Sequence, residues 1–537
     1  MSMSERFAQV PKITIPRARY DRTHDVKTTL DPDFLVPVLI DPIYPGDSVQ
    51  LNMSFICRQF TALYPALDQL VLESFFFFVP NRLLWENWHK FLGEQEDPGD
   101  SIDYTLPVVT LDTDAAAAHG TLGDYFGIPL IDYNTSNYTC QAMPIRSYYK
   151  VWNDHFRDEN LQPTVSQEGE SAFSFTLDDG PDSDGRLFTN NTVHGLQKRG
   201  KRKDYFTGSL PWTQKQTEAV TIPGSEIDVI TDSAVGDHIG IYSTDQTSYQ
   251  DMSTDGTAGG EVELDATPVG SAYKMYVDTS ESEISINALR LAIQTQRFLE
   301  KDARAGTRAH EVIYSHYGVS PPHMAWRSEF LGGGSTVINS TPVAVTADTG
   351  TYNPGDLAAA GTGFGTGHGF TKSFTEHGWL LGLINIRLAN QSYTEGFERW
   401  WQDSTRYDIM WPSLQFTGEQ AVLNREIFID DATITAGTDD SVFGYQEKYG
   451  HLKYKEDKIT GLFRSNAGTT LDVWHYQEEF GSTPTLDATF ITSNAEEGVD
   501  RNSGAPSEPL FKFNAKMQYH HSRTMAVYSV PGMMDHF

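Results

Sequence analysis

A very apolar run that leads into an aromatic segment is the feature that most constrains the fold of this chain. Residues 74–94 read SFFFFVPNRLLWENWHKFLGE. Phe75–Val79 are bulky residues that favour a β-strand, and Pro80 ends it. Asn81 is a good N-cap for a helix, and Gly93 would end it. One face of this helix would carry Leu84, Trp85, Trp88 and Phe91. The pattern predicts a strand–helix unit buried in a core or at a subunit interface.

Most of the remaining chain has the pattern of short strands separated by turns. Apolar runs at Ser48–Phe55, Ala421–Ile429 and Leu471–Tyr476 are bounded by Gly, Pro, Asn and Asp. This is typical of a mainly β, antiparallel protein with long loops and few short helices. One helix is predicted at Ile286–Ala305, and a second is indicated by an aromatic series at i, i+4 and i+8: Tyr148, Trp152 and Phe156. We expect both helices to pack their apolar faces into the body of the protein.

Three stretches look like insertions into one domain that spans residues 1–537. Gly224–Tyr273 contains ten Asp or Glu residues and no Lys or Arg, so we expect an acidic surface insertion. Gly332–Gly369 is rich in Gly, Thr and Ala, and we expect a loop region there. Ser493–Pro509 has the composition of a polar loop.

The distribution of charge limits how this chain can contact nucleic acid. The formal net charge of −32 excludes a protein whose whole surface binds DNA, so any contact must be local. One basic stretch near the start of the chain contains Arg17, Arg19 and Arg22. The other is a short run made of Lys198, Arg199, Lys201, Arg202 and Lys203. Taken alone, such a run is typical of a solvated loop.

The sequence carries no signature of an active site or cofactor site. The metalloprotease, serine-hydrolase and calcium-loop motifs are absent, and Gly361–Gly369 fits neither a dinucleotide-binding nor a phosphate-binding loop. We therefore predict no enzyme activity, no catalytic residue, no cofactor and no metal ligand. Trp400–Trp401 could stack on a sugar, but buried packing is the expected role. The adjacent pair His520–His521 is attributed to chance.

The compartment is also constrained by the sequence. The N-terminus has no apolar core of the kind that a secretory signal needs, and no segment approaches the roughly 20 apolar residues of a membrane span. We therefore expect no membrane insertion. Cys57 and Cys140 allow at most one disulfide, and a reduced cytosol is the simpler inference.

The order of motifs along the chain resembles the major capsid protein of gokushoviruses, small circular single-stranded DNA phages of the microvirus family. The FFFFVPNRLLWENW block is joined by SYYKVWNDHFRDENLQ, LQKRGKRKDYFTGSLPW and LRLAIQTQRFLEKDARAGTR. The C-terminal half adds YGVSPP, EFLGGGS, SFTEHG, GEQAV, FGYQEKYGHLKYK, LDVWH and PGMMDHF. The resemblance covers nearly the whole chain.

This resemblance implies an eight-stranded antiparallel jelly roll of the viral capsid type. About sixty copies would close into a T=1 icosahedral shell around single-stranded DNA, assembled in the cytoplasm of a bacterial host as the virion capsid. The acidic insertion, residues 224–273, would rise as a three-fold protrusion and meet a bacterial surface receptor. The two basic stretches would face the DNA inside. Further implied partners are a small basic DNA-packaging protein, an internal scaffolding protein and a DNA pilot protein.

Two other classes of protein fit parts of the pattern. A β-rich carbohydrate-binding or glycan-hydrolysing protein would share the acidity, the tryptophans and the glycine-rich loops. A receptor-binding spike would share the long polar insertions, with another chain forming the shell.

Overall fold

The computed structural model describes residues 16–528 with internal gaps and divides into two compact units. One unit comprises Met1–Thr213 with Gly306–Phe537, and the other comprises Gln214–Ala305. Between residues 216 and 285 only five short strands are described. The other gaps are residues 61, 96, 112–118, 132–137, 166–177, 184–194, 320–325, 345, 347–354, 356 and 506–507.

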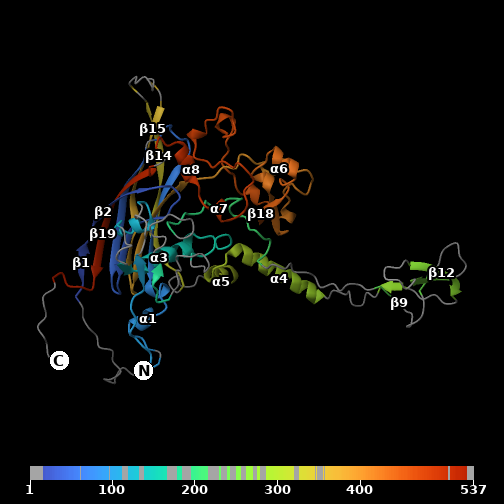
Figure 1. Cartoon of the computed structure of the whole chain (residues 1–537), viewed down its shortest axis with the longest axis horizontal. Coiled ribbons are helices and arrows are strands. Elements are labelled where there is room, and N and C mark those ends of the chain that lie inside the picture. The colour runs from blue at the N-terminus through green and yellow to red at the C-terminus, as the bar shows by residue number, and fades with distance from the viewer. Residues whose placement is uncertain are drawn as a thin grey trace. The chain divides into compact units, whose positions relative to one another are not determined.

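Eight antiparallel strands form the framework of the first unit (Figure 1). They pair in two groups of four, in the orders β2-β19-β4-β15 and β3-β16-β5-β14, and pairing of β14 with β15 joins the groups. The short strand β1 (Ala18–Asp21) extends the β2 edge along β19. The eight strands are β2 (His24–Leu30), β3 (Val36–Ile43), β4 (Ser48–Gln59), β5 (Leu70–Pro80), β14 (Glu329–Ala344), β15 (Leu357–Ser373), β16 (Gly378–Leu388) and β19 (Phe511–Arg523). This curled antiparallel framework is the predicted eight-stranded jelly roll.

The remaining elements lie mostly in the long β5–β14 and β16–β19 connections. The first connection holds a small sheet of β6 (Val108–Leu111), β7 (Tyr138–Gln141) and β8 (Asp182–Ser183). The second holds a β17–β18 pair, Glu419–Leu423 with Val442–Glu447. Short helices in these connections are α2 (Leu122–Tyr125), α3 (Met143–Val151), α5 (Ala309–Tyr317), α6 (Asp431–Ala436), α7 (Ala488–Ile491) and α8 (Ala495–Arg501).

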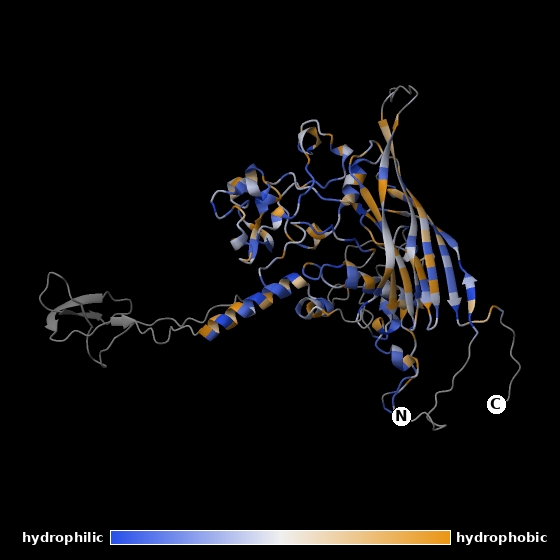
Figure 2. Ribbon diagram, turned by 180° about the vertical axis from the view of Figure 1, so that it is seen from behind, coloured by the Kyte–Doolittle hydropathy of each residue, from blue (hydrophilic) through white to orange (hydrophobic). Residues whose placement is uncertain are grey.

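The jelly-roll strands β4 and β19 alternate between buried and solvent-facing residues, as a half-buried sheet requires. Along β4 every second side chain is buried, from Val49 to Cys57. Along β19 the same alternation runs from Phe511 to Tyr519. Colouring by hydropathy shows the alternation on the strands of this unit (Figure 2).

The strand β5 differs because it is buried on both faces. Phe76 and Phe78 pack against Phe370 and Phe374 of the β15 segment, with ring centroids 5.7 and 4.6 Å apart. Their neighbours Phe75 and Phe77 point to the opposite face. There they contact Phe156, which ends the π-helical turn Trp152–Phe156 after α3.

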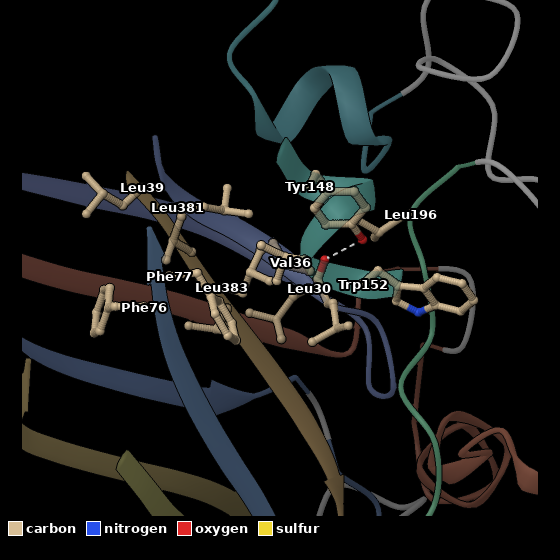
Figure 3. Packing of buried hydrophobic residues seen from close by; sticks show 14 of the residues in the cluster. Leu30, Val36, Leu39, Phe76, Phe77, Tyr148, Trp152, Leu196, Leu381 and Leu383 are labelled. Atoms are coloured by element: carbon tan, nitrogen blue, oxygen red, sulfur yellow. Dashed lines mark hydrogen bonds between the residues drawn. The ribbon is translucent and has the colours of Figure 1, made fainter. Parts of the chain in front are cut away.

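The helix α3 and its π-helical extension lie against the framework strands. Tyr148 is fully buried, and its hydroxyl donates to the Leu35 carbonyl at 2.9 Å. Figure 3 shows Tyr148 and Trp152 beside Val36 and Leu196 in this core. The predicted aromatic series therefore forms a helical core face, as expected.

The segment after β5 is buried as predicted but is not one helix. It forms a 3-10 turn (Asn81–Leu83) and a separate α1 (Trp88–Phe91), and no side-chain cap hydrogen bond comes from Asn81. Gly93 ends the segment at φ +96°. Trp85 is fully buried, and its Nε1 donates to Asp179 Oδ1 at 2.7 Å. This hydrogen bond ties the segment to Asp179. The single continuous helix expected from the sequence did not include such a contact.

The glycine-rich stretch 332–369 is not a loop region, and that prediction is wrong. Most of it belongs to β14 and β15, which lie between β5 and β4 in the sheet. Glycine permits unusually close strand contacts here, because a Cβ on Gly333 would lie 2.0 Å from the Ser74 carbonyl oxygen. A Cβ on Gly369 would lie 2.0 Å from the Leu51 carbonyl oxygen.

Three smaller expectations also change. Only the first three residues of the predicted run Ala421–Ile429 lie in a strand, β17 (Glu419–Leu423). Leu471–Tyr476 contains a 3-10 turn at Asp472–Trp474. The polar stretch Ser493–Pro509 includes helix α8.

The second unit contains helix α4 (Ile286–Ala305), whose bounds match the prediction, and Gly306 follows it at φ +94°. The predicted apolar face is not packed as expected, since Ile286, Leu289 and Ile293 on that face are 68%, 37% and 50% exposed. The acidic insertion is described only as the backbone of short strands: β9 (Val229–Thr231), β10 (Ile239–Ile241), β11 (Tyr249–Thr254), β12 (Val262–Val269) and, just beyond it, β13 (Met275–Val277). The remainder of the insertion lies outside the described residues.

Replacement of Trp88 by Ala should lower the free energy of unfolding by about 3–5 kcal/mol, because the buried indole leaves a cavity beside Trp85 and Phe91. Chemical denaturation of the purified subunit measures this change. Trp401→Ala is the matched control, since that ring is 64% exposed and its loss should change stability by less than about 0.5 kcal/mol. Equal stability of the two variants would contradict the burial of Trp88.

Candidate nucleic-acid interface

The basic run at residues 198–203 is built into the framework by its backbone. The Leu35 amide donates to the Gln197 carbonyl at 2.9 Å, and the Arg199 amide donates to the Asp33 carbonyl at 2.8 Å. On the other side, the Ser493 amide donates to the Arg199 carbonyl at 2.9 Å. The run is therefore held between the β2–β3 connection and the segment before α8, and it is not the solvated loop that its charge suggests.

Four of the five cations in this run are paired with carboxylates of the same chain. Arg199 shares Glu73 with Arg387, and burial together with repulsion by Arg387 lowers the pKa of Arg199 to about 10. The other three pairs are Lys198 with Glu496, Lys201 with Glu478 and Lys203 with Asp158. Arg202 is exposed and makes no ion pair within the described part of the chain. It is the member of the run best able to meet an external anion.

The aromatic residues that follow the run are core residues. Tyr205 and Phe206 are 2% and 5% exposed. They belong to a second hydrophobic cluster that includes Tyr393, Val422 and Phe490. Neither ring is accessible for stacking on a base.

The N-terminal basic residues are part of the sheet edge and not a free arm. Arg17 Nη2 donates to Ser48 Oγ at 3.1 Å, and Arg22 forms a two-pronged ion pair with Asp41. Arg19, on β1, is exposed and makes no ion pair among the residues described. Its pairing position opposite Ser522 fixes this residue at the edge of the sheet.

Arg22 also joins a buried polar cluster that the sequence did not reveal. His521 is fully buried, and its Nε2 lies 2.9 Å from Asp47 Oδ2 while its Nδ1 lies 3.6 Å from Asp41 Oδ2. Burial raises the pKa of Asp41, but hydrogen bonds with His521, Arg22 and Tyr519 outweigh it and bring the value to about 2. The interpretation of His520–His521 as a chance pair is wrong for His521. Alternation along β19 was the available signal, since it places His521 on the inward face.

A further group of arginines lies next to the basic run in space and was also missed. Arg157, Arg308 and Arg327 line a cavity of about 660 Å³ together with Arg199 and Arg202. Arg157 is distant from the other two in the sequence, and none of the three belongs to a run of basic residues, so no local charge pattern marks them.

The tryptophan pair is exposed, in contrast to its expected burial. Trp400 and Trp401 are stacked with ring centroids 4.3 Å apart and are 45% and 64% exposed. They lie on a short 3-10 turn, Arg399–Gln402, and line a cavity with Tyr205, Phe206 and Tyr393 of the second hydrophobic cluster.

Across the described part of the chain, no group of three or more His, Cys, Asp or Glu side chains is arranged to hold a metal ion. Cys57 and Cys140 are not joined in a disulfide, and burial raises the pKa of Cys57 to about 12. Among the helices described, none is long and apolar enough to span a membrane.

Comparison with known proteins gives consistent matches over the whole length. A family model described as "Capsid protein (F protein)" matches residues 8–533. The chain is 35% identical to capsid protein VP1 of Chlamydia phage 1, over 99% of this chain and 98% of that protein. It is 36% identical to capsid protein VP1 of Bdellovibrio phage phiMH2K, again over 99% and 98%. It is 28% identical to capsid protein VP1 of Spiroplasma virus 4, over 97% and 96%.

Replacement of Arg22 by Gln should lower stability at neutral pH by roughly 1–2 kcal/mol, because the buried, ionised Asp41 loses its ion pair with Arg22, whose own side chain is partly exposed. The folded pKa of Asp41 lies below its ordinary value of 3.8, so this stabilisation is present above pH 4 and is lost as the pH falls towards about 2. Thermal denaturation at a series of pH values measures it.

The difference between Arg22→Gln and the unmodified protein should therefore shrink steadily below pH 4. Arg19→Gln is the control, since Arg19 makes no ion pair in the described structure and its loss should have little effect at any pH. A destabilisation by Arg22→Gln that is constant from pH 7 to pH 2 would contradict the role assigned to the Asp41 pair.

Proposed function

This chain belongs to the capsid protein (F protein) family, and we propose that about sixty copies of it close into a T=1 shell around a single-stranded DNA genome. It is a structural protein of the virion, and its copies assemble into the viral shell. The full-length family match, together with the jelly-roll framework, carries this conclusion. Because members of the family are shell proteins and not enzymes, the glycan-hydrolysing alternative is wrong.

The shell proposal is supported by the exposed apolar surface of the single chain. Large side chains are exposed along the β16–β19 connection, among them Trp401, Ile409 and Phe416. Closed shells need the same chain to offer complementary patches around several symmetry axes, and such patches are broad and rich in aromatic residues. This chain covers 98% of each of two capsid proteins VP1, which agrees with a shell supplied by one chain.

Expression of the full chain with the other proteins of its phage should give closed particles of uniform size. Cryo-electron microscopy with icosahedral reconstruction measures the copy number, and about sixty chains per particle is the expected result. Particles of another triangulation number would contradict T=1 while leaving the shell function in place. A persistent monomer under every assembly condition would contradict the shell function itself.

We also propose that the acidic insertion, residues 224–273, projects outward from the shell at the three-fold axes and contacts the host surface. Ten carboxylates without a basic residue among them would be very costly to bury or to hold against encapsidated phosphate. This stretch belongs to the compact unit Gln214–Ala305 and not to the unit that contains the jelly-roll strands.

Exchange of residues 224–273 for a short Gly/Ser linker should leave particles able to assemble but unable to adsorb to host cells. Sedimentation measures assembly, and depletion of particles from a cell suspension measures adsorption. A variant that keeps the full length but carries Asn or Gln at the ten acidic positions separates the effect of charge from that of the protrusion. Failure of the linker variant to assemble would identify the insertion as part of the framework.

The genome contact is proposed to involve the exposed members of the two basic stretches. Arg17, Arg19 and Arg202 are exposed and have no ion pair within the described chain, whereas Arg22 and most of the 198–203 run are neutralised by carboxylates. So few free cations cannot neutralise a genome, and we propose that a small basic packaging protein supplies most of the positive charge. Internal scaffolding and pilot proteins are proposed as further partners, from the family resemblance alone.

A further inference from the structure

The cavity beside the basic run has an unusual lining. It lies between β5, the turn that ends α3, residues 199–203 and the start of β14, and its volume is about 660 Å³. Eight of its lining residues are Arg or Lys and two are Asp or Glu. In a chain with a net charge of −32, this is a strong local reversal of sign.

Several of these cations are already neutralised. Arg199 and Arg387 share Glu73, and Arg308 lies 3.2 Å from Glu159 and 3.3 Å from Glu311. Lys201 and Lys203 have the partners described above. These pairs fix the walls of the cavity and leave little charge for a ligand.

Of the other three cavity cations, Arg327 Nη1 lies 2.6 Å from His310 Nε2, and Arg157 and Arg202 make no ion pair with a carboxylate in the described structure. Arg157 donates from Nη1 to the Gln162 carbonyl at 2.8 Å, but its Nε is buried without a hydrogen-bond partner. Arg202 is exposed at the same cavity. The buried, unpartnered Nε shows that the hydrogen-bonding capacity of the Arg157 guanidinium is not used up within the described chain.

The pKa values of Arg157 and His155 are lowered in part by the neighbouring positive charges of the cavity. Burial lowers the pKa of Arg157, and repulsion by Arg308 lowers it further. Burial lowers the pKa of His155 to about 4, and Arg327 and Arg308 contribute in the same direction. The imidazole is therefore neutral at physiological pH and adds no charge of its own.

One aromatic ring at the cavity is accessible. Phe330 is 52% exposed, and its ring centroid lies 5.4 Å from Phe77 and 6.4 Å from Phe75. The buried rings beneath it hold Phe330 in place while one side stays open to solvent. An exposed ring beside unpaired guanidinium groups is the combination that binds unstacked nucleotides.

We propose that this cavity binds one nucleotide unit of single-stranded nucleic acid, with Arg157 and Arg202 on the phosphate and Phe330 stacked on the base. This inference rests on the proposed genome-enclosing function and assigns it a specific site. Guanidinium groups match phosphate oxygens through paired donors, and a ring stacks on a base of any identity. An acidic segment of a second copy would use the same cations but would have no need of Phe330.

The test uses the full-length protein and a short fluorescently labelled oligothymidylate, with affinity measured by anisotropy over a salt series. Arg202→Gln should weaken binding several-fold and make the slope of log affinity against log salt shallower by about 0.7. Phe330→Leu should weaken binding about tenfold and leave the salt slope unchanged. Both positions are exposed, so thermal denaturation should show normal folding.

Two controls give each result a meaning. Lys455→Gln, at an exposed position in a different cavity, should leave oligonucleotide affinity unchanged. An abasic oligodeoxynucleotide should bind the Phe330→Leu variant and the unmodified protein equally, because it has phosphates but no base to stack.

The proposal would be overturned if Arg202→Gln and Phe330→Leu both bind the oligonucleotide normally while assembled particles still enclose DNA. In that case the genome-enclosing function stands and the site is elsewhere. It would also be overturned if polyglutamate displaces the oligonucleotide as well as unlabelled oligothymidylate does and Phe330→Leu has no effect, which would assign the cavity to an acidic protein segment. Particles that never contain DNA would instead contradict the genome-enclosing function.

Discussion

Burial of β5 on both of its faces is the constraint on which the rest of the structure depends. Phe76 and Phe78 fill the space between the two sheets, so the opposite strands must supply inward aromatic and aliphatic residues. Phe75 and Phe77 need cover on the outer face, which the turn ending α3 provides through Phe156. The long β5–β14 connection thus supplies outer packing for the strand from which it starts, and the same packing forms one wall of the basic cavity.

The sequence predicted the parts of the fold in which side chains carry the signal. The alternating strand β4, the buried β5 and the bounds of α4 follow from periodicity, since each has large apolar residues at regular positions. The strands β14 and β15 could not be found in this way. At Gly333 and Gly369 the neighbouring strand backbone lies too close for a Cβ atom, so only glycine fits at these positions. Absence of a side chain gives no periodicity, so a close-packed strand has the composition of a loop.

The candidate site was predicted by residue type and only partly by position. Local charge marked the 198–203 run, but its neutralising partners Glu73, Glu478 and Glu496 are distant in the sequence and become neighbours only through the fold. The same limit hid Arg157, whose place beside Arg202 depends on the path of the β5–β14 connection. The helix α4 shows the converse case. Its amphipathic pattern predicted the helix, yet the pattern cannot tell whether the apolar face is covered within one chain or by another copy.

Pairing of cations inside the chain explains how an acidic shell protein can carry basic segments near its framework. Lys201 is almost fully buried, and without Glu478 its charge would lack both solvent and a counter-ion. Each such pair contributes to the fold but removes one charge from any contact with DNA. In the proposed genome contact, the remaining guanidinium groups, of which Arg157 and Arg202 are the clearest, are too few for strong electrostatic binding, so stacking and hydrogen bonding would have to supply much of the affinity. A shell of the proposed kind would therefore position nucleic acid at defined points and would need a separate source of cations to condense it.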